Sequence, residues 1–147
     1  MRVSTRGRYG LRAMLDLALN DAGGPIPLSE VSKRQGISLY YLEQLFNKLK
    51  KSGLVKSKPG AGGGYTLARA TRDITVGDII RCVEGPIAPV QCADGNGGRK
   101  YCPRADDCIA RALWKRLGAK IENFLDSVTL MELCEEAAVL NQRGEKD

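Results

Sequence analysis

Three cysteines in one loop are the side chains of this sequence best suited to chemistry. Cys92, Cys102 and Cys108 are separated by nine and five residues, in a segment rich in glycine, proline and polar residues. Zinc sites usually bring two ligands in a short C-x-x-C knuckle, which this loop lacks. Three thiolates in a flexible loop favour an iron–sulfur cluster, which takes soft ligands at irregular spacing. Reactive thiols without a metal are the alternative interpretation.

The composition argues against several classes of protein. The chain of 147 residues contains no histidine, which removes the commonest general base and the usual nitrogen ligand of metals. It also lacks P-loop, G-x-S-x-G and dinucleotide-binding motifs, so we expect no enzyme and no small-molecule substrate. No apolar run is long enough to cross a bilayer and no h-region is present, which predicts a cytoplasmic protein without a membrane partner. Five cysteines, an odd number, argue against a secreted disulfide framework.

Positive charge is concentrated in the first half of the chain. Residues 1–68 hold 11 Lys and Arg against 4 Asp and Glu, a net charge of +7. Residues 69–147 hold 12 basic against 13 acidic residues, a net charge of −1. This asymmetry is expected of a nucleic-acid-binding surface. The length suggests one domain, or one small domain with an assembly element.

The stretch from Ser38 to Leu67 is the one that would use this charge. Apolar residues at i, i+3, i+4 and i+7 predict a helix that Ser38 caps and Gly53 ends, with buried positions at Leu42, Leu45, Phe46 and Leu49. Its opposite face presents side chains that can reach phosphates and base edges in a major groove, namely Tyr40, Tyr41, Gln44, Asn47, Lys48 and Lys51.

A short hairpin is predicted directly after this helix. Two β-prone runs, 54–58 and 65–67, are joined by a loop from Pro59 to Gly64, whose glycines allow positive φ and close approach to a phosphodiester. A preceding short helix, 28–34, is closed by Gly36 and completes a helix-turn-helix. Together these elements predict a winged helix-turn-helix that binds DNA. A solvated charged helix beside an ordinary hairpin is the alternative.

An amphipathic helix is predicted from Leu11 to about Asn20 in the N-terminal segment, with Arg2, Arg6 and Arg8 ahead of it. Basic residues at a helix N-terminus oppose the helix dipole, so contact with phosphates explains them better than helix stability does. Solubility is the alternative. After the hairpin, a capping box formed by Thr75 and Asp78 predicts another helix.

The longest helix is predicted from about Cys108 to Ser127. Its apolar residues repeat every three or four positions, as in a coiled coil, at Leu113, Leu117, Ile121, Phe124 and Val128. An isologous dimer would bury this face and match an operator with two half-sites, whereas packing back onto its own domain is the alternative. A last short helix follows, with Leu130, Leu133, Cys134 and Ala137 on one face.

The predicted fold is mainly α with a small β-hairpin wing, a winged helix-turn-helix joined to a long dimerisation helix. Residues 1–84 would form the DNA-binding domain, and residues 85–107 the cysteine-containing cluster-binding loop. Residues 108–140 would form the dimerisation helix and the short last helix, and residues 141–147 a flexible polar tail.

Several motifs resemble those of the IscR family of iron–sulfur cluster regulators over nearly the whole chain. The matching residues are Met1-Arg2, Gly7-Arg8-Tyr9, Gln35-Gly36-Ile37-Ser38, Tyr41-Leu42-Glu43-Gln44-Leu45-Phe46, Gly53-Leu54-Val55, Gly62-Gly63-Gly64-Tyr65 and the three-cysteine region with Ala112-Leu113-Trp114. The resemblance implies a homodimeric transcription factor, repressor or activator, that controls genes for building iron–sulfur clusters.

The resemblance also implies a ligand set and a DNA surface. A cluster, 2Fe–2S, would be held by Cys92, Cys102 and Cys108 of each subunit. DNA would be contacted by Arg2, Tyr9, Ser38, Tyr40, Glu43, Gln44 and the wing from Lys58 through Gly60, Gly62 and Gly63 to Gly64. We expect the cluster to order the loop against the recognition helix and the long helix, and so to change which operators the dimer binds.

Two positions depart from the family pattern. Arg111 stands where the pattern has a histidine as fourth cluster ligand, and a permanent cation cannot coordinate a metal. The fourth ligand would be an oxygen, an unassigned cysteine or a group of the partner chain, and the carboxylate candidates are Glu43, Asp94, Asp106 and Asp107. A carboxylate is a harder ligand than a thiolate, which predicts a labile cluster. In the wing, Pro59 replaces a frequent arginine, and Lys58 would substitute for it.

Overall fold

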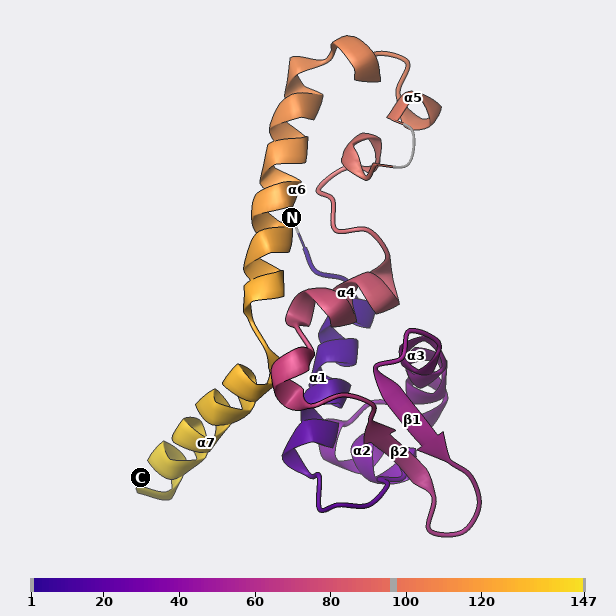
Figure 1. Cartoon of the computed structure of the whole chain (residues 1–147), viewed down its shortest axis with the longest axis vertical. Helices are drawn as coiled ribbons and strands as arrows, with labels where there is room; N and C mark the ends of the chain where they lie inside the picture. The colour runs from indigo at the N-terminus through magenta and orange to yellow at the C-terminus, as the bar shows by residue number, and fades with distance from the viewer. Residues whose placement is uncertain (1, 96–97, 147) are drawn as a thin grey trace.

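The computed structural model describes residues 2–95 and 98–146 (Figure 1). Four helices and a hairpin form the N-terminal part, in the order α1 (Thr5–Leu19), α2 (Leu28–Gln35), α3 (Leu39–Lys51), β1 (Val55–Lys58), β2 (Gly64–Leu67), the 3₁₀ turn η1 (Thr71–Asp73) and α4 (Val76–Glu84). In the described ranges, no helix is long and apolar enough to cross a membrane. The mainly α fold with a small hairpin wing is confirmed.

The apolar stripe of α3 is the centre of the core, as predicted. Leu42, Leu45, Phe46 and Leu49 are all buried, and they pack with residues of α1, α2 and α4 such as Met14, Val31 and Ile79. The predicted caps are present: the Ser38 side chain accepts from Tyr41 N at 3.1 Å, and Gly36 adopts the left-handed conformation, φ 65°. The polar face of α3 is therefore left to solvent.

Helix α1 begins earlier than predicted, at Thr5, so Arg6 and Arg8 lie inside its first turns rather than ahead of it. The reason is a contact with a residue that is distant in the sequence. The carboxylate of Glu84, at the end of α4, accepts hydrogen bonds from the backbone N–H (2.9 Å) and hydroxyl of Ser4. A negative charge at this helix N-terminus offsets the unfavourable basic residues.

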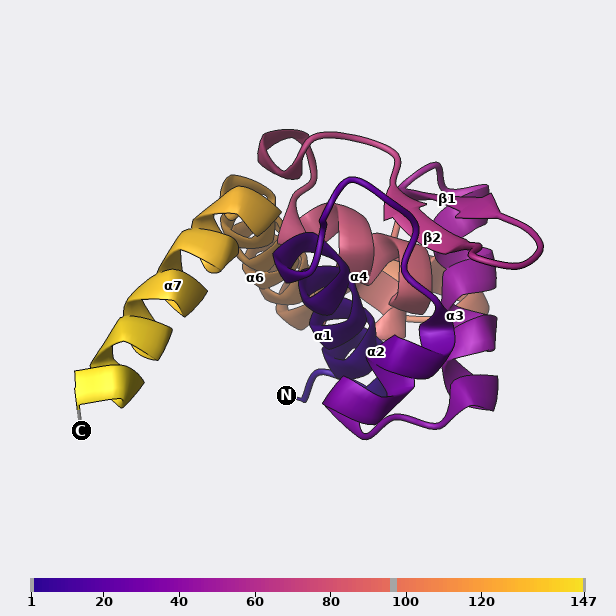
Figure 2. The ribbon, with the colours of Figure 1, turned by 90° about the horizontal axis from the view of Figure 1, so that it is seen from below.

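The hairpin is joined to the segment before α2 by an isolated β-bridge. Strands β1 and β2 pair antiparallel, with Val55 opposite Leu67, and Ile26 pairs with Tyr65 through two backbone hydrogen bonds of 2.9 Å. The ring of Tyr65 also packs on Phe46 of α3 at a centroid distance of 4.9 Å. Figure 2 shows that α3 and the hairpin lie on the same side of the domain, remote from the last helix.

The C-terminal part leaves the domain as two helices. The segment after α4 contains the short turns η2 (Gln91–Ala93), α5 (Gly98–Tyr101) and η3 (Ala105–Asp107), followed by α6 (Ile109–Ser127) and α7 (Leu130–Lys146). Helix α6 matches its prediction. Helix α7 is 17 residues long and continues through Lys146, so the predicted short helix with a tail from 141 is wrong in extent; Asp147 lies outside the described residues.

Helix α6 is anchored to α4 by charge and by backbone pairing. Arg81 forms ion pairs with Asp126 (2.6 Å) and Glu122 (3.1 Å), both on α6. At the turn into α7, Leu130 N donates to Ile74 O at 2.9 Å, and the Leu130 side chain is fully buried in the core of the winged domain. The long helix is thus joined to the winged domain rather than tethered loosely beside it.

Asp16 is the one charged residue with a buried side chain in the described ranges, at 2% exposure. Its carboxylate on α1 accepts a bidentate pair of hydrogen bonds from Arg34 of α2, at 2.8 and 3.0 Å, and a third from the Gln35 amide at 2.9 Å. Because burying an unpaired carboxylate is strongly unfavourable, these contacts fix how α2 lies on α1. They also raise the pKa of Arg34, chiefly through its hydrogen bond to Asp16.

Replacing Asp16 by alanine should destabilise the protein by about 2–3 kcal/mol, somewhat less than for a fully buried pair because Arg34 stays partly hydrated. The matched control is Glu30→Ala, which removes the other carboxylate near Arg34, an exposed partner at 3.6 Å. That change should cost under about 0.5 kcal/mol. Urea unfolding measures both, and equal losses for the two variants would contradict this role for Asp16.

Replacing Gly64 by alanine should displace the hairpin. Its φ is +152°, and a Cβ there would lie 2.6 Å from Pro27 N and closer still to the Ile26 carbonyl, both of which are backbone. We expect a loss of about 2 kcal/mol in unfolding free energy and faster exchange of the Ile26 and Tyr65 amides. Gly24→Ala is the control, because a Cβ at Gly24 would meet nothing within 4 Å. An unchanged exchange rate in the Gly64 variant would refute the close approach.

Candidate nucleic-acid interface and cysteine loop

The solvent-facing side of α3 carries most of the residues predicted to contact DNA. Tyr40 is 72% exposed, and the other exposed polar positions on this helix are Glu43, Gln44, Asn47, Lys48, Lys50 and Lys51. Ser38, which caps the helix, is also exposed. Tyr41 differs from the prediction, because it lies half-buried at the edge of this face and makes a T-shaped contact with Tyr9, at a centroid distance of 5.7 Å.

Tyr9 is the centre of a small cluster between α1 and α3. The guanidinium groups of Arg8 and Arg12 lie 5.9 and 5.3 Å from the centre of its ring. Arg12 also donates to the Gln35 side chain at 3.3 Å and to the Gln35 backbone carbonyl, at the end of α2. The sequence reasoning missed Arg12. Arg12 lies four residues after Arg8, with Tyr9 between them, and this spacing is the feature of the sequence that could have identified it.

The hairpin contributes a second exposed, basic surface. Lys56 and Lys58 of β1 are exposed, as is Pro59 at the start of the turn. Gly60 and Gly62 have φ of +87° and +73°, and a Cβ at Gly63 would meet the carbonyl of Lys58. The tip is therefore a chain of backbone groups with little side-chain cover, which can approach a phosphate closely. Arg2, at the start of the described chain, is exposed as well.

The cations of α3 and the hairpin have no ion-pair partner within the described residues. The lysines concerned are Lys48, Lys50, Lys51, Lys56 and Lys58. Basic side chains that are not neutralised within the protein are available to a polyanion. Glu43 is the one carboxylate of α3, and it lies on the wing side of the helix, in a depression shared with Pro27, Asn47 and Tyr65.

The three loop cysteines are half-buried and free of disulfides. Cys92 lies in η2, Cys102 follows α5, and Cys108 occupies the N-cap position of α6. Within the described residues, no three Cys, Asp or Glu side chains are gathered closely enough to hold a metal ion. Soft thiolates from one loop are suitable donors for an iron–sulfur cluster, but the loop must rearrange to bring them into one ligand set.

The carboxylates considered as fourth ligand are dispersed. Asp106 is paired with Arg99, Asp107 is exposed at the end of η3, and Asp94 lines a pocket beside α6. Glu43 shares its depression with no cysteine. The loop contacts α6 through η2, whereas the expected contact with α3 is not among the principal contacts of the described elements. Helix α6 in turn contacts α4, and α4 contacts α3.

Arg111, at the position where a histidine ligand was expected, contacts the loop backbone. Its Nε donates to Cys92 O at 2.7 Å, and a second guanidinium nitrogen donates to Ala105 O at 3.1 Å. A Cβ at Gly98 would lie 2.7 Å from Cζ of Arg111, so the guanidinium packs directly on that glycine. Sequence reasoning identified the substitution but not the contacts it makes.

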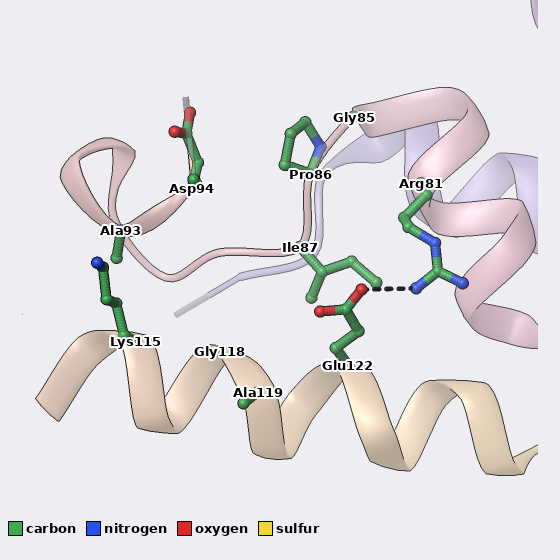
Figure 3. A pocket seen from close by; sticks show the side chains of 11 residues that line it. Arg81, Gly85, Pro86, Ile87, Ala93, Asp94, Lys115, Gly118, Ala119 and Glu122 are labelled. Carbon is green, nitrogen blue, oxygen red and sulfur yellow. Dashed lines mark hydrogen bonds and ion pairs between the residues drawn. The ribbon is translucent and has the colours of Figure 1, made fainter. Parts of the chain in front are cut away.

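A pocket of about 550 Å³ separates the beginning of the loop from α6 and α4 (Figure 3). Figure 3 shows Lys115 and Glu122 projecting from α6 toward it, with Arg81 of α4 paired to Glu122 at 3.1 Å. Ala93 and Asp94, next to Cys92, form the opposite wall. In Figure 3, Ala93 lies across from Lys115, whereas Glu122 and its ion pair with Arg81 lie beside Ile87.

The remaining two cysteines lie apart from the loop. Cys82 of α4 is half-buried and packs against the core. Burial, the larger effect, and the neighbouring Glu135 both raise the pKa of Cys134 on α7. A raised thiol pKa lowers the thiolate fraction at neutral pH and makes Cys134 a poor nucleophile and a poor metal ligand.

Comparison with known proteins gives consistent matches. Residues 3–136 match the model of the Rrf2 family, described as iron-dependent transcriptional regulators. The HTH-type transcriptional regulator IscR of Escherichia coli is 46% identical over 144 residues, which cover 98% of this chain and 86% of that protein.

Solved structures give the same result. IscR of T. potens is 42% identical, with a TM-score of 0.74 over 93% of this chain and 88% of that chain. CymR, the global cysteine regulator of B. subtilis, is 40% identical, with a TM-score of 0.73 over 92% of this chain and 98% of that chain.

Proposed function

The chain belongs to the Rrf2 family of iron-dependent transcriptional regulators, and we propose that it senses iron–sulfur status through a cluster bound in its cysteine loop. It is a DNA-binding regulator rather than an enzyme, as are the IscR proteins to which it is similar. We further propose that it controls genes for iron–sulfur cluster assembly. The observation that carries the proposal is the presence of three half-exposed thiols in one loop beside α6, in a chain 46% identical to an IscR.

The DNA surface comprises α3, the hairpin and the N-terminal arm. In this arrangement α3 enters the major groove, where Tyr40, Gln44 and Glu43 face base edges. Lys48 and Lys51 contact phosphates from the far end of the helix, and the glycine-rich tip of the hairpin follows the adjacent backbone. Ser38 and Arg2 supply further polar contacts, while Tyr9 acts by supporting Tyr41.

The protein would act as a homodimer on an operator with two half-sites. Large apolar side chains of α6 are exposed among the described residues: Ile109 is 88% exposed and Phe124 is 65% exposed. Exposed large side chains repeating along one helix are typical of an interface, and an isologous pairing would place two α3 helices on successive turns of DNA. The alternative, in which α6 packs back onto its own domain, would leave these residues buried.

Cys92, Cys102 and Cys108 would hold the cluster, which supplies an iron- and redox-dependent charge when bound. The fourth ligand would come from a loop carboxylate, with Asp94 the best placed because it lies two residues after Cys92. The protein's own contribution to signalling would be mechanical. A change in the position of residues 92–94 would act on the wall of the pocket that faces Lys115, and through α6 on the pairing of Glu122 with Arg81.

A cluster-free regulator that responds through its thiols is the principal rival, because the structure of CymR, a global cysteine regulator, is nearly as similar as that of IscR. The described loop does not gather its thiols, which suits a regulator that responds through free thiols without a metal. A zinc-stabilised module on the same scaffold is a further rival. These rivals differ from our proposal in what metal the purified protein contains.

Anaerobically purified protein should contain iron and acid-labile sulfide and absorb visible light, as iron–sulfur clusters do. Cys92→Ser should remove the colour and most of the iron, whereas Cys134→Ser, outside the loop, should keep both. Metal analysis and an absorption spectrum measure this directly. Colourless protein that regulates through thiols, or stoichiometric zinc without iron, would reject the cluster proposal and leave the DNA-binding function intact.

Substitutions on α3 should separate sequence reading from phosphate contact. Lys48→Ala and Lys51→Ala should weaken binding to all sequences and each lower the slope of log K against log salt by about 1. Glu43→Ala should instead relax the preference for particular bases, since a carboxylate in the groove accepts from cytosine N4 and repels phosphates.

Binding of selected and random duplexes over a salt series tests both expectations. Lys120→Ala, on α6, is the control for removal of one positive charge elsewhere. A uniform loss of affinity in the Glu43 variant, or a changed base preference in the lysine variants, would show that α3 is placed wrongly in the groove.

A further inference from the structure

We propose that Arg111 is a positioning residue that holds the cysteine loop on α6 in the metal-free protein, through a bridge between Cys92 O and Ala105 O. The two carbonyls belong to η2 and η3, thirteen residues apart, and one guanidinium donates to both, at 2.7 and 3.1 Å. Arg111 itself is on α6. One side chain therefore joins two turns of the loop, η2 and η3, to α6.

The chemistry of the guanidinium suits this role. It is planar, permanently charged and carries five N–H donors in a fixed fork, so it can bind two separated carbonyls at once. Hydrogen bonds from a charged donor are stronger than those between neutral groups. Among the described residues, no other donor is hydrogen-bonded to either carbonyl oxygen, and a buried carbonyl needs a partner. The two hydrogen bonds of Arg111 thus hold η2 and η3 in place on α6 without any contribution from metal ligation.

Close packing at Gly98 supports the same conclusion. A Cβ at this position would lie 2.5–2.8 Å from three atoms of the Arg111 guanidinium. The first residue of α5 must therefore be glycine for the guanidinium to lie where it does. Gly98, which lies between η2 and η3, therefore packs on the same guanidinium that donates to Cys92 O and Ala105 O.

The bridge has a consequence for the thiols. In the bridged arrangement the three cysteines are half-buried and are not gathered into a ligand set within the described residues. With the bridge in place, the described turns of the loop are held on α6 and the thiols are partly protected. This inference concerns the loop to which the proposed function assigns the cluster, but it is stated for iron-free protein and holds or fails without iron.

The experiment compares backbone exchange and thiol alkylation in iron-free, full-length protein, with each cysteine resolved by peptide mass spectrometry. Arg111→Ala should speed alkylation of Cys92 and Cys102, and amide exchange across 99–106, by about tenfold or more, the factor expected from losing one charged hydrogen bond. Arg111→Lys should give an intermediate effect, because an ammonium cannot span both carbonyls. Alkylation of Cys82 and Cys134 should not change.

Two further variants make the test specific. Arg116→Ala removes an exposed arginine on the same helix that makes no ion pair or hydrogen bond with the described residues, and it should match the wild type. Gly98→Ala keeps Arg111 but displaces it. Alanine favours helix over glycine, so a purely local effect on α5 would slow exchange, whereas loss of the bridge should speed it.

Wild-type rates in Arg111→Ala, or slower exchange in Gly98→Ala, would overturn the proposal. Should Arg111→Ala unfold the whole chain, the exchange and alkylation rates of Gly98→Ala and Arg111→Lys still test the proposal. If the bridge is confirmed but the anaerobic protein holds no iron, the proposed cluster fails while the inference about Arg111 stands.

Discussion

The buried carboxylate of Asp16 sets the geometry on which the DNA-reading side of this protein depends. Because this carboxylate is shielded from solvent, it needs hydrogen-bond donors from the protein. The guanidinium of Arg34 and the amide of Gln35, both in the last turn of α2, supply them. This fixes the end of α2 on α1 and, one residue later, the left-handed Gly36 from which the chain turns into α3. Arg12 ties the same end of α2 to α1 a second time, through the carbonyl of Gln35. Helix α3 is therefore presented at a defined angle by polar contacts as well as by its apolar stripe.

The remainder of the chain is coupled to the domain that carries α3 by close packing and ion pairs. Glycines on α1 let α4 approach, since a Cβ at Gly10 would lie 3.3 Å from the methyl groups of Val83. On the other side of α4, Arg81 pairs with Glu122 and Asp126 of α6. Helix α4 is thus packed between the domain that carries α3 and the helix that carries the loop. A displacement at either side must be accommodated by α4, because packed interiors do not deform freely.

The elements with periodic patterns could be predicted from the sequence, and contacts between distant residues could not. The stripe of α3, the capping box of α4, the hairpin and α6 follow local rules, and all are present. The start of α1 was misplaced because its N-terminal charge balance depends on Glu84, eighty residues away. The pairing of Ile26 with Tyr65 leaves no local signal either. The three loop cysteines and the unusual Arg111 were recognisable by type and position, but spacing alone could not say that the described loop keeps the thiols apart or what the arginine contacts.

The pairing of the hairpin has a consequence for how the protein behaves in the absence of its nucleic acid. Strand β2 is covered on both sides, by β1 and by Ile26, so the exposed edge of the sheet is β1. An open edge invites strand addition from another molecule, the first step of aggregation, and lysines along it discourage that step. Lys56 and Lys58 stand on this edge. The same two charges that suit a phosphate backbone therefore keep free molecules from joining edge to edge when no duplex is bound.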